Sequence, residues 1–328
     1  MIVVRAPFRI PLGGGGTDLP SYYSKFGGSL ISVAIDKYVV TTVNRPMIDK
    51  LIRLKYSKSE TVEKINQVEH DLIREALKLT GVINRIELSW IADVPFGTGM
   101  GSSGTFLVST LKALHAISGD EVTTKQIAEE ACRIEIEILE SPVGKQDQYM
   151  AAFGGVTRLE IDKSGDVEVI RPNVSIEILR DLENSLVVFY TGIRRSSGKI
   201  LSKQNSSVKR GDRSVQNNLH FIKELGKEIV IALEEGNIRK FGALLDAHWQ
   251  YKRRLSDQVS SSEIDRWYQE ARYAGAIGGK IIGAGGGGFM VFCCPGDKSE
   301  LRNMMIKEGL VEIHVRFDME GTKVLVNF

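Results

Sequence analysis

The apolar residues of the N-terminal half follow two different periods, one typical of strands and the other of helices. β-Branched residues dominate four segments, which we predict to be strands: residues 1–10, 29–43, 51–57 and 85–93. Residues 62–81 carry apolar side chains at helical spacing, and this pattern predicts a helix that ends at Gly81. Residues 105–119 and 123–139 predict two more helices, the second of which begins at a threonine cap.

The C-terminal half shows the same mixture without a regular order. A hairpin is predicted at residues 154–172, and five further strands at residues 185–192, 280–294, 311–318 and 321–328, where residues 280–294 are two strands around a glycine turn. Helices are predicted at residues 219–234, 238–254, 262–275 and 299–310. Because strands and helices do not alternate regularly, we predict an α+β fold. A boundary near residues 175–185 divides it into domains of residues 1–180 and 181–328.

The composition is that of an ordinary globular protein, with 42% hydrophobic and 26% charged residues among 328. A net charge of +2 without a polybasic tract argues against a nucleic-acid partner. The three cysteines have no zinc-site spacing, and we expect them to be reduced thiols. No segment has the pattern of a secretion signal or a membrane span, so we expect a soluble, cytoplasmic protein without a membrane partner; its oligomeric state stays open.

Much of the glycine content lies in three runs, and the run PFGTGMGSSGT separates a predicted strand from a predicted helix. The spacing Gly99-x-Gly101-x-x-Gly104 matches the dinucleotide fingerprint, but a second helix follows instead of the next strand of a β-α-β unit. The Walker pattern is absent. A strand, a glycine loop and a helix N-terminus together bind polyphosphate through backbone N–H groups. We therefore predict ATP-phosphate binding by Gly97, Gly99, Gly101, Ser102, Ser103, Gly104 and Thr105.

Three motifs occur in order: APFRIPLGGGGTD at residues 6–18, PFGTGMGSSGT at residues 95–105, and KIIGAGGGGFMVF at residues 280–292. They resemble the three motifs of the superfamily of galactokinase, homoserine kinase, mevalonate kinase and phosphomevalonate kinase, the GHMP kinases. The resemblance implies an N-terminal domain like that of ribosomal protein S5 and a ferredoxin-like C-terminal domain, with the active site between them. It also implies ATP and Mg²⁺ as cofactors.

The resemblance assigns catalytic and metal-binding roles to four residues. Ser103 and Glu135 match the family's magnesium ligands, a hydroxyl and a carboxylate that suit a cation keeping several waters. Asp147 matches the aspartate that accepts or orients the proton of the substrate hydroxyl. Arg9 matches the arginine beside it, which would keep the aspartate ionised and offset charge in the transition state. Without the resemblance, Glu135 could be a solvated helix acid and Asp147 a helix cap.

The first motif bears on the substrate. Asp18 matches the galactokinase aspartate that hydrogen-bonds sugar hydroxyls, whereas Gly15 and Gly16 replace the Glu and His of galactokinases and enlarge the pocket. The stretch PFRIPLGGGGTDLPSYY resembles the D-glycero-D-manno-heptose 7-phosphate kinases, which phosphorylate the anomeric O1. The resemblance thus implies a small-molecule sugar phosphate, with a substrate site drawn from Gly15, Gly16, Thr17, Asp18, Gly144, Arg194, Arg195, Lys280, Gly285, Gly286 and Gly287.

A phosphorylated sugar requires cations for its distal phosphate. Candidates from the sequence are Arg194, Arg195, Lys199, Lys37 and Lys280. The product would supply nucleotide-activated heptose for a surface polysaccharide. The alternatives are another anomeric sugar kinase, of the fucose, arabinose or galactose type, and a non-catalytic regulator that binds sugar or ATP. Such a regulator is expected to have lost the catalytic aspartate, its arginine or the metal acid, all of which this chain has.

Overall fold

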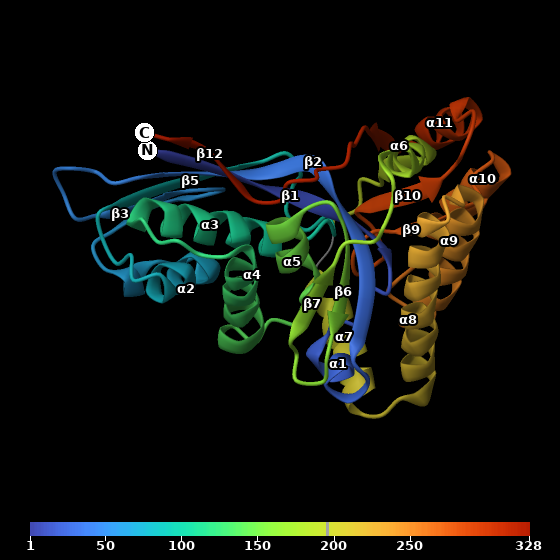
Figure 1. The fold of residues 1–328 in the computed structure, drawn as a ribbon, viewed down its shortest axis with the longest axis horizontal. Helices are drawn as coiled ribbons and strands as arrows, with labels where there is room; N and C mark the ends of the chain where they lie inside the picture. Colours follow the sequence, from blue (N-terminus) through green and yellow to red (C-terminus); the bar gives the residue numbers. More distant parts are fainter. Residues whose placement is uncertain (195–196) are drawn as a thin grey trace.

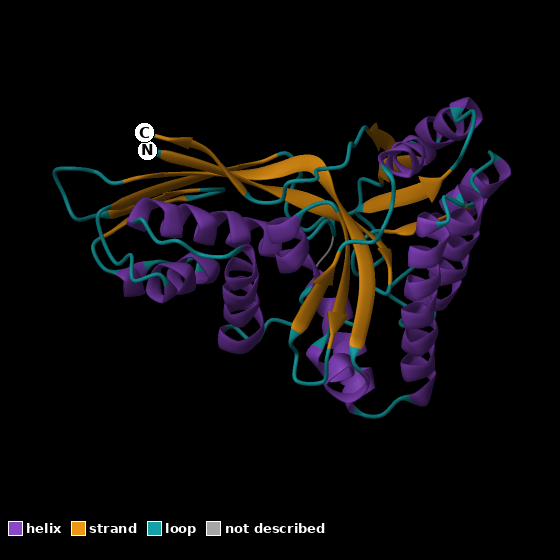
Figure 2. Ribbon diagram, viewed as in Figure 1, coloured by secondary structure: helices purple, strands orange, loops and turns teal. Residues whose placement is uncertain are grey.

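The computed structural model describes residues 1–194 and 197–328, so Arg195 lies outside the described residues. The described chain folds into a larger and a smaller β-sheet with helices packed against both (Figure 1; Figure 2). This mixture of sheets and unevenly spaced helices confirms the predicted α+β class.

Long antiparallel strands build most of the larger sheet. Its order is β12-β1-β2-β5-β3-β4, and β6 joins β2 to β7, with the bounds β1 Ile2–Gly13, β2 Gly28–Asn44, β3 Ile52–Lys55, β4 Ser59–Val62, β5 Ile86–Ala92, β6 Val156–Ile161, β7 Val167–Ile170 and β12 Lys323–Asn327. The smaller sheet has the order β11-β8-β10-β9, with the bounds β8 Leu186–Tyr190, β9 Gly278–Ile281, β10 Phe289–Cys293 and β11 Val311–Ile313. Strand β3 pairs with β5 in parallel.

The helices connect the two sheets into one structure. In the N-terminal half they are α1 Pro20–Phe26, η1 Ile65–Gln67, α2 Asp71–Leu79, α3 Ser102–Ser118, α4 Thr124–Cys132, η2 Arg133–Ile138 and α5 Gln146–Phe153. In the C-terminal half they are α6 Ile176–Ser185, α7 Ser197–Lys209, α8 Arg213–Glu234, α9 Ile238–Lys252, α10 Ser262–Tyr273 and α11 Ser299–Lys307. Helix α3 packs on β1 and β2, while α8 contacts β1 and β2 and α9 contacts β9.

The predicted helix at residues 62–81 is wrong in its first half. Strand β4 includes Val62, η1 is a single 3₁₀ turn, and the α-helix begins only at Asp71. Side chains compete for the backbone here, because Gln67 Oε1 accepts the N–H of Lys64 and a carboxylate oxygen of Glu60 accepts the N–H of Glu69. Helices α1, α5, α6 and α7 were not predicted.

The last strand of the chain returns to the larger sheet. Strand β12 pairs with β1 of the larger sheet, with Val326 opposite Val3. Residues 323–327 therefore belong to the sheet of the N-terminal half, although their sequence position placed them in the C-terminal domain. Residue 180 itself lies within α6.

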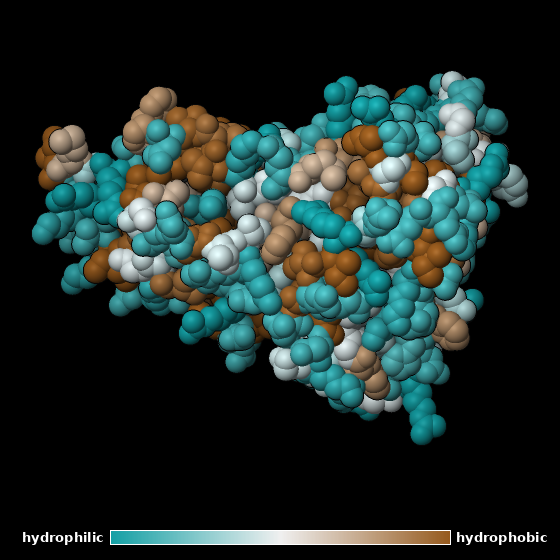
Figure 3. Space-filling model, viewed as in Figure 1, coloured by the Kyte–Doolittle hydropathy of each residue, from teal (hydrophilic) through white to brown (hydrophobic). Residues whose placement is uncertain are grey.

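Exposed apolar side chains gather at the end of the larger sheet where both termini lie (Figure 3). Met1, Leu325 and Phe328 are exposed there. This surface is at the opposite end of β1 from the glycine-rich segment that follows the strand. Among the helices of the described residues, none has the length and apolar character needed to cross a bilayer.

A buried histidine at the end of α3 should make stability depend on pH. The imidazole of His115 lies 2.7 Å from Glu130 and 3.3 Å from Asp120, and the bond with Glu130 raises the pKa of His115. A raised pKa stabilises the fold fully below the unfolded value near 6.5, and this contribution is lost as pH rises through the folded value. We expect His115→Gln to lower the free energy of unfolding more at pH 6 than at pH 9, measured by urea denaturation. His314→Gln, at a side chain 84% exposed, is the control, and a pH-independent loss in His115→Gln would contradict the assignment.

Candidate active site

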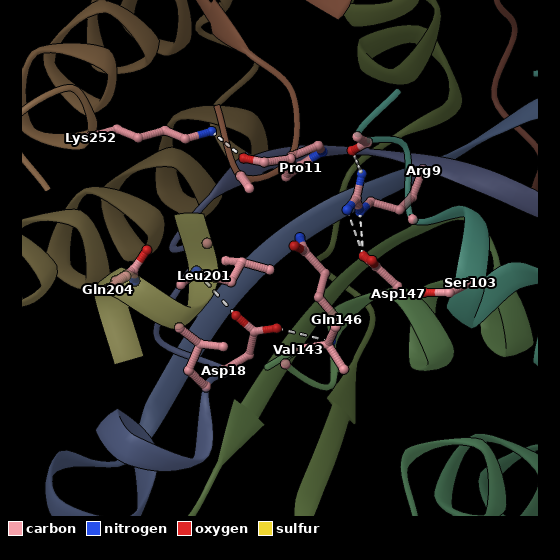
Figure 4. A pocket seen from close by; sticks show the side chains of 18 of the residues that line it. Arg9, Pro11, Asp18, Ser103, Val143, Gln146, Asp147, Leu201, Gln204 and Lys252 are labelled. Carbon is pink, nitrogen blue, oxygen red and sulfur yellow. Dashed lines mark hydrogen bonds and ion pairs between the residues drawn. The ribbon is translucent and has the colours of Figure 1, made fainter. Parts of the chain in front are cut away.

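A cavity of about 220 Å³ lies between the N-terminal and C-terminal halves of the chain and has walls from both (Figure 4). The end of β1, the loop before α3 and the segment before α5 form one side, and α7, α9 and the loop after β9 form the other. The cavity brings together twelve of the predicted site residues: Arg9, Gly15, Gly16, Asp18, Gly97, Gly99, Gly101, Ser102, Ser103, Gly144, Asp147 and Lys280.

The glycine loop before α3 forms the wall beside the helix N-terminus. Gly97, Gly99 and Gly101 have φ angles of 81°, 87° and 84°, which glycine adopts without strain. The first turn of a helix has N–H groups without helical partners, and Ser102 and Ser103 of this turn line the cavity. Such a wall favours an anion.

The glycine run of the third motif packs directly on this loop. A Cβ atom on Gly283 would lie 2.2 Å from the carbonyl oxygen of Gly99, and one on Gly288 would lie 2.0 Å from that of Thr98. Only glycine allows this approach. Two segments about 180 residues apart in the sequence thus form one continuous rim of the cavity.

Arg9 fixes Asp147 at the cavity wall. The Arg9 Nε and Nη2 atoms lie 2.7 and 2.6 Å from Asp147 Oδ1, and Nη1 donates to the carbonyl of Gly99 at 3.0 Å (Figure 4). Arg9 is 4% exposed, whereas the Asp147 side chain keeps 26% of its surface exposed. Within the described residues the hydrogen bonds reach Oδ1, so Oδ2 can accept a hydrogen bond from a substrate hydroxyl.

Two glycines of the loop make room for this aspartate. A Cβ atom on Gly101 would lie 2.8 Å from Asp147 Cγ, and one on Gly104 would lie 2.8 Å from Asp147 Cβ. Gly104 was predicted to bind phosphate, but it does not line the cavity and instead packs against Asp147. Closely spaced glycines in this loop therefore indicate close packing against a side chain as well as a site for an anion.

We expect Gly101→Ala to lower kcat by at least about tenfold, because the added methyl group displaces Asp147 by a distance that matters for a positioned group. The left-handed φ also costs about 1–2 kcal/mol of stability for a residue with a Cβ atom. Gly119→Ala separates these effects. Gly119 ends the same helix with a φ of 77° and has no atom within 4 Å of its Cβ position, so only stability should fall. Equal kinetics in the two variants would contradict this packing role.

Ser103 and Glu135 meet behind the glycine loop. Glu135 lies in the π-helical turn η2 and is 2% exposed. Burial raises the pKa of Glu135 to about 7, although hydrogen bonds from Ser103 and Gln148 oppose the shift. Gln148 Nε2 donates to Glu135 Oε2 at 2.6 Å.

This donor set fits magnesium. A divalent cation stabilises the ionised form of a buried carboxylate beside a hydroxyl, because its positive charge offsets the cost of burying the negative charge. Magnesium prefers few protein ligands and completes its shell with phosphate oxygens and water. In the part of the chain that the structure describes, no group of three or more His, Cys, Asp or Glu residues forms a separate metal site.

Asp18 is held in place by the backbone. Its two carboxylate oxygens accept the N–H groups of Gly16 and Gln146, each at 3.1 Å (Figure 4). Burial raises the pKa of Asp18. A Cβ atom on Gly144 would lie 2.0 Å from Asp18 Oδ2, so this glycine allows the carboxylate its position. Asp18 thus lines the cavity in a fixed orientation suited to accepting hydroxyl hydrogen bonds.

Several cavity residues were not predicted. They are Pro11, Leu19, Phe96, Val143, Gln146, Leu201, Gln204, His248, Lys252, Leu255, Gly283 and Ala284. Gln204 of α7 explains the glycine at position 16, because its Nε2 would lie 2.7 Å from a Cβ atom there. His248 and Lys252 lie four residues apart on one face of α9. This spacing of two basic residues in a predicted helix could have identified them from the sequence.

Other predicted site residues do not line the cavity. The hydroxyl of Thr17 donates to Gly14 and Ser29, and that of Thr105 to Pro7, so both groups serve the fold. The remaining predicted residues outside the lining are Gly285, Gly286, Gly287, Arg194, Lys199 and Lys37. Gly285 and Gly287 pack against Val259 and Ile193, Arg194 and Lys199 are exposed, and Lys37 pairs with Asp36.

Comparison with known proteins agrees with this fold and site. Residues 63–155 match the N-terminal domain of GHMP kinases, and residues 229–310 match their C-terminal domain. Together with the cavity between the two halves, these matches define the class: the chain belongs to the GHMP kinases, which transfer a phosphoryl group from ATP.

Two similar sequences have assigned activities. The D-glycero-alpha-D-manno-heptose 7-phosphate kinase of Campylobacter jejuni is 30% identical over 98% of this chain and 98% of its own. The galactokinase of Pyrococcus furiosus is 26% identical over 91% of this chain and 90% of its own. Among solved structures, a D-glycero-D-manno-heptose 1-phosphate kinase from Bacteroides thetaiotaomicron superposes over 100% of both chains with a TM-score of 0.82. At 22% identity, that structure supports the fold alone.

Proposed function

We propose that this GHMP kinase phosphorylates the anomeric O1 of D-glycero-D-manno-heptose 7-phosphate to give the 1,7-bisphosphate. The observation that carries the proposal is the first motif, where Asp18 lines the cavity while Gly15 and Gly16 add no side chains. Buried basic residues in the same cavity favour a phosphorylated substrate. The 30% identity with a heptose 7-phosphate kinase supports the same substrate.

The geometry supports a direct transfer. In the proposed reaction Asp147 accepts the proton of the O1 hydroxyl while O1 forms a bond to the γ-phosphorus and the bond from that phosphorus to ADP breaks. Arg9 orients Asp147 through Oδ1 and adds positive charge close to the reacting oxygens. The N–H groups at the start of α3 would bind the polyphosphate. Asp18 would orient the sugar through its hydroxyl groups.

Magnesium would be held by the Ser103 hydroxyl and the Glu135 carboxylate. When bound, the cation would neutralise charge on the polyphosphate. Gln148 orients the carboxylate through its 2.6 Å hydrogen bond, so Gln148 acts in positioning.

The substrate is tested by ADP release from a panel of sugars at equal concentrations: heptose 7-phosphate, heptose, galactose, fucose and arabinose. We expect kcat/KM for heptose 7-phosphate to exceed that for each unphosphorylated sugar by at least about 100-fold, because a buried charged contact is lost without the phosphate. Phosphorus NMR of the product should show a second phosphate on the anomeric oxygen. Equal or better turnover of an unphosphorylated hexose would overturn the substrate, though not the kinase class.

A further inference from the structure

The cavity wall from the C-terminal half carries three buried basic side chains. His248 and Lys252 lie one turn apart on α9, Lys280 lies on β9, and all three line the cavity. Their exposed fractions are 1%, 9% and 1%. Burying the positive charge of Lys280 without an opposite charge among the described residues is unfavourable, so its place in a basic cavity wall indicates an anionic ligand.

Backbone carbonyl groups orient both lysines. Lys280 Nζ donates to Leu12 at 2.9 Å, and Lys252 Nζ donates to Ile281 at 2.8 Å and to Gly283 at 2.5 Å. Within the described residues, Lys280 forms no ion pair with a carboxylate. An ammonium group has three N–H bonds, so its contact with Leu12 leaves two for a ligand. The carbonyl groups therefore aim Lys280 without neutralising it.

His248 completes the cluster with an imidazole that has no hydrogen-bond partner among the described residues. Neither Nδ1 nor Nε2 is hydrogen-bonded to a described residue. Burial lowers the pKa of His248, and the positive charges of Lys280 and Lys252 lower it further. Burial also lowers the pKa of Lys280, as do the charges of Lys252 and Arg9. A bound anion would favour the charged lysine and accept a hydrogen bond from the ring.

The two carboxylates of the cavity are engaged elsewhere. Asp147 bonds to Arg9, and Asp18 accepts backbone N–H groups. Figure 4 shows Lys252 on the side of the cavity opposite Ser103 and Asp147.

We propose that His248, Lys252 and Lys280 form a second anion subsite, which holds the phosphate of a phosphorylated sugar while the glycine loop holds the nucleotide. The identity of the sugar rests on the proposed function, but the subsite itself needs only a phosphate group. The other cations suggested by the sequence and described in the structure do not line the cavity: Arg194, Lys199 and Lys37. Among the cations that the sequence suggested for the distal phosphate and that the structure describes, Lys280 lines the cavity.

Steady-state kinetics of Lys280→Met and His248→Leu test the subsite, with Lys240→Met near the exposed start of α9 as the control. We expect KM for heptose 7-phosphate to rise by about 10–100-fold in Lys280→Met, the cost of losing a charged hydrogen bond. His248→Leu should raise it less, and Lys240→Met not at all. KM for heptose 7-phosphate should rise more than KM for ATP or KM for unphosphorylated heptose does, which separates the loss of a phosphate contact from a general loss of binding. An increase confined to KM for ATP would assign the cluster to the nucleotide and overturn the proposal.

A binding measurement keeps the subsite testable whichever sugar is turned over. With the glycine loop saturated by a non-hydrolysable ATP analogue and Mg²⁺, inorganic phosphate should still raise the thermal midpoint of the wild type and of Lys240→Met. It should not raise that of Lys280→Met. The unliganded Lys280→Met protein should have a thermal midpoint at least as high as that of the wild type, because it no longer buries a charge. Measuring this midpoint also checks that the variant folds.

The outcomes separate the two proposals. Equal protection of wild type and Lys280→Met by phosphate, or no protection of either, overturns the subsite. Phosphate protection that Lys280→Met loses supports the subsite even if the sugar panel rejects heptose 7-phosphate. In that case the proposed substrate fails, and another phosphorylated sugar is the ligand to test.

Discussion

Asp147→Asn is expected to retain ATP binding and to lose about 10²–10⁴-fold in kcat, the range for loss of a positioned general base. The amide preserves the size of the side chain and can still accept a hydrogen bond from Arg9, but it cannot take the proton of the sugar hydroxyl. The measurement is kcat from ADP release, alongside ATP affinity by calorimetry.

A surface aspartate provides the control for this variant. Asp166 pairs with Lys125 at an exposed position, so Asp166→Asn should turn over normally. An Asp147→Asn protein with unchanged kcat would show that Arg9 and Asp147 form a structural ion pair. A protein that had lost ATP affinity as well as kcat would show that Asp147 supports the glycine loop, through Gly101, more than it serves the reaction.

Glu135→Gln is expected to abolish stabilisation by magnesium together with most of the activity. A ligand that binds only the folded protein stabilises it by about 2.7 kcal/mol at a hundred times its Kd. We expect Mg²⁺ with a non-hydrolysable ATP analogue to raise the thermal midpoint of the wild type more than the analogue alone does. The extra increase should disappear in Glu135→Gln, because an amide binds a divalent cation weakly.

Glu137→Gln is a closely matched control, since Glu137 lies in the same π-helical turn but is exposed. It should keep the full magnesium effect. If Glu135→Gln keeps that effect too, the carboxylate is not a ligand. Its contact with Gln148 would then be a packing interaction in the core beneath α3.

Local sequence patterns predicted much of the N-terminal wall of the cavity. The glycines at 97, 99 and 101 have the left-handed φ angles that such a loop requires, and Ser102 begins α3. These features depend on backbone conformation within a few residues, so they can be read from the chain. The direction of the Thr105 hydroxyl could not be predicted in this way, because it depends on packing against β1.

The C-terminal wall could not be predicted in the same way. Helix α7 has the sequence SGKILSKQNSSVK, with few apolar residues at helical spacing, yet it places Gln204 against Gly16. Lys280 was a candidate among five cations. Its burial and its bond to Leu12, across 268 residues, distinguish it from the exposed members of that set.

The sequence by itself determined the α+β class and the three glycine-rich segments, because turns, caps and motif spacing are local properties of a chain. Its resemblance to the GHMP kinases pointed to Arg9, Ser103, Glu135 and Asp147. Tertiary structure decided which of these groups meet. Arg9 reaches Asp147 across 138 residues, β12 returns to β1, and His248 joins Lys252 and Lys280 in one wall. Such contacts follow from how sheets and helices pack, and the spacing of residues along the chain does not encode that packing directly.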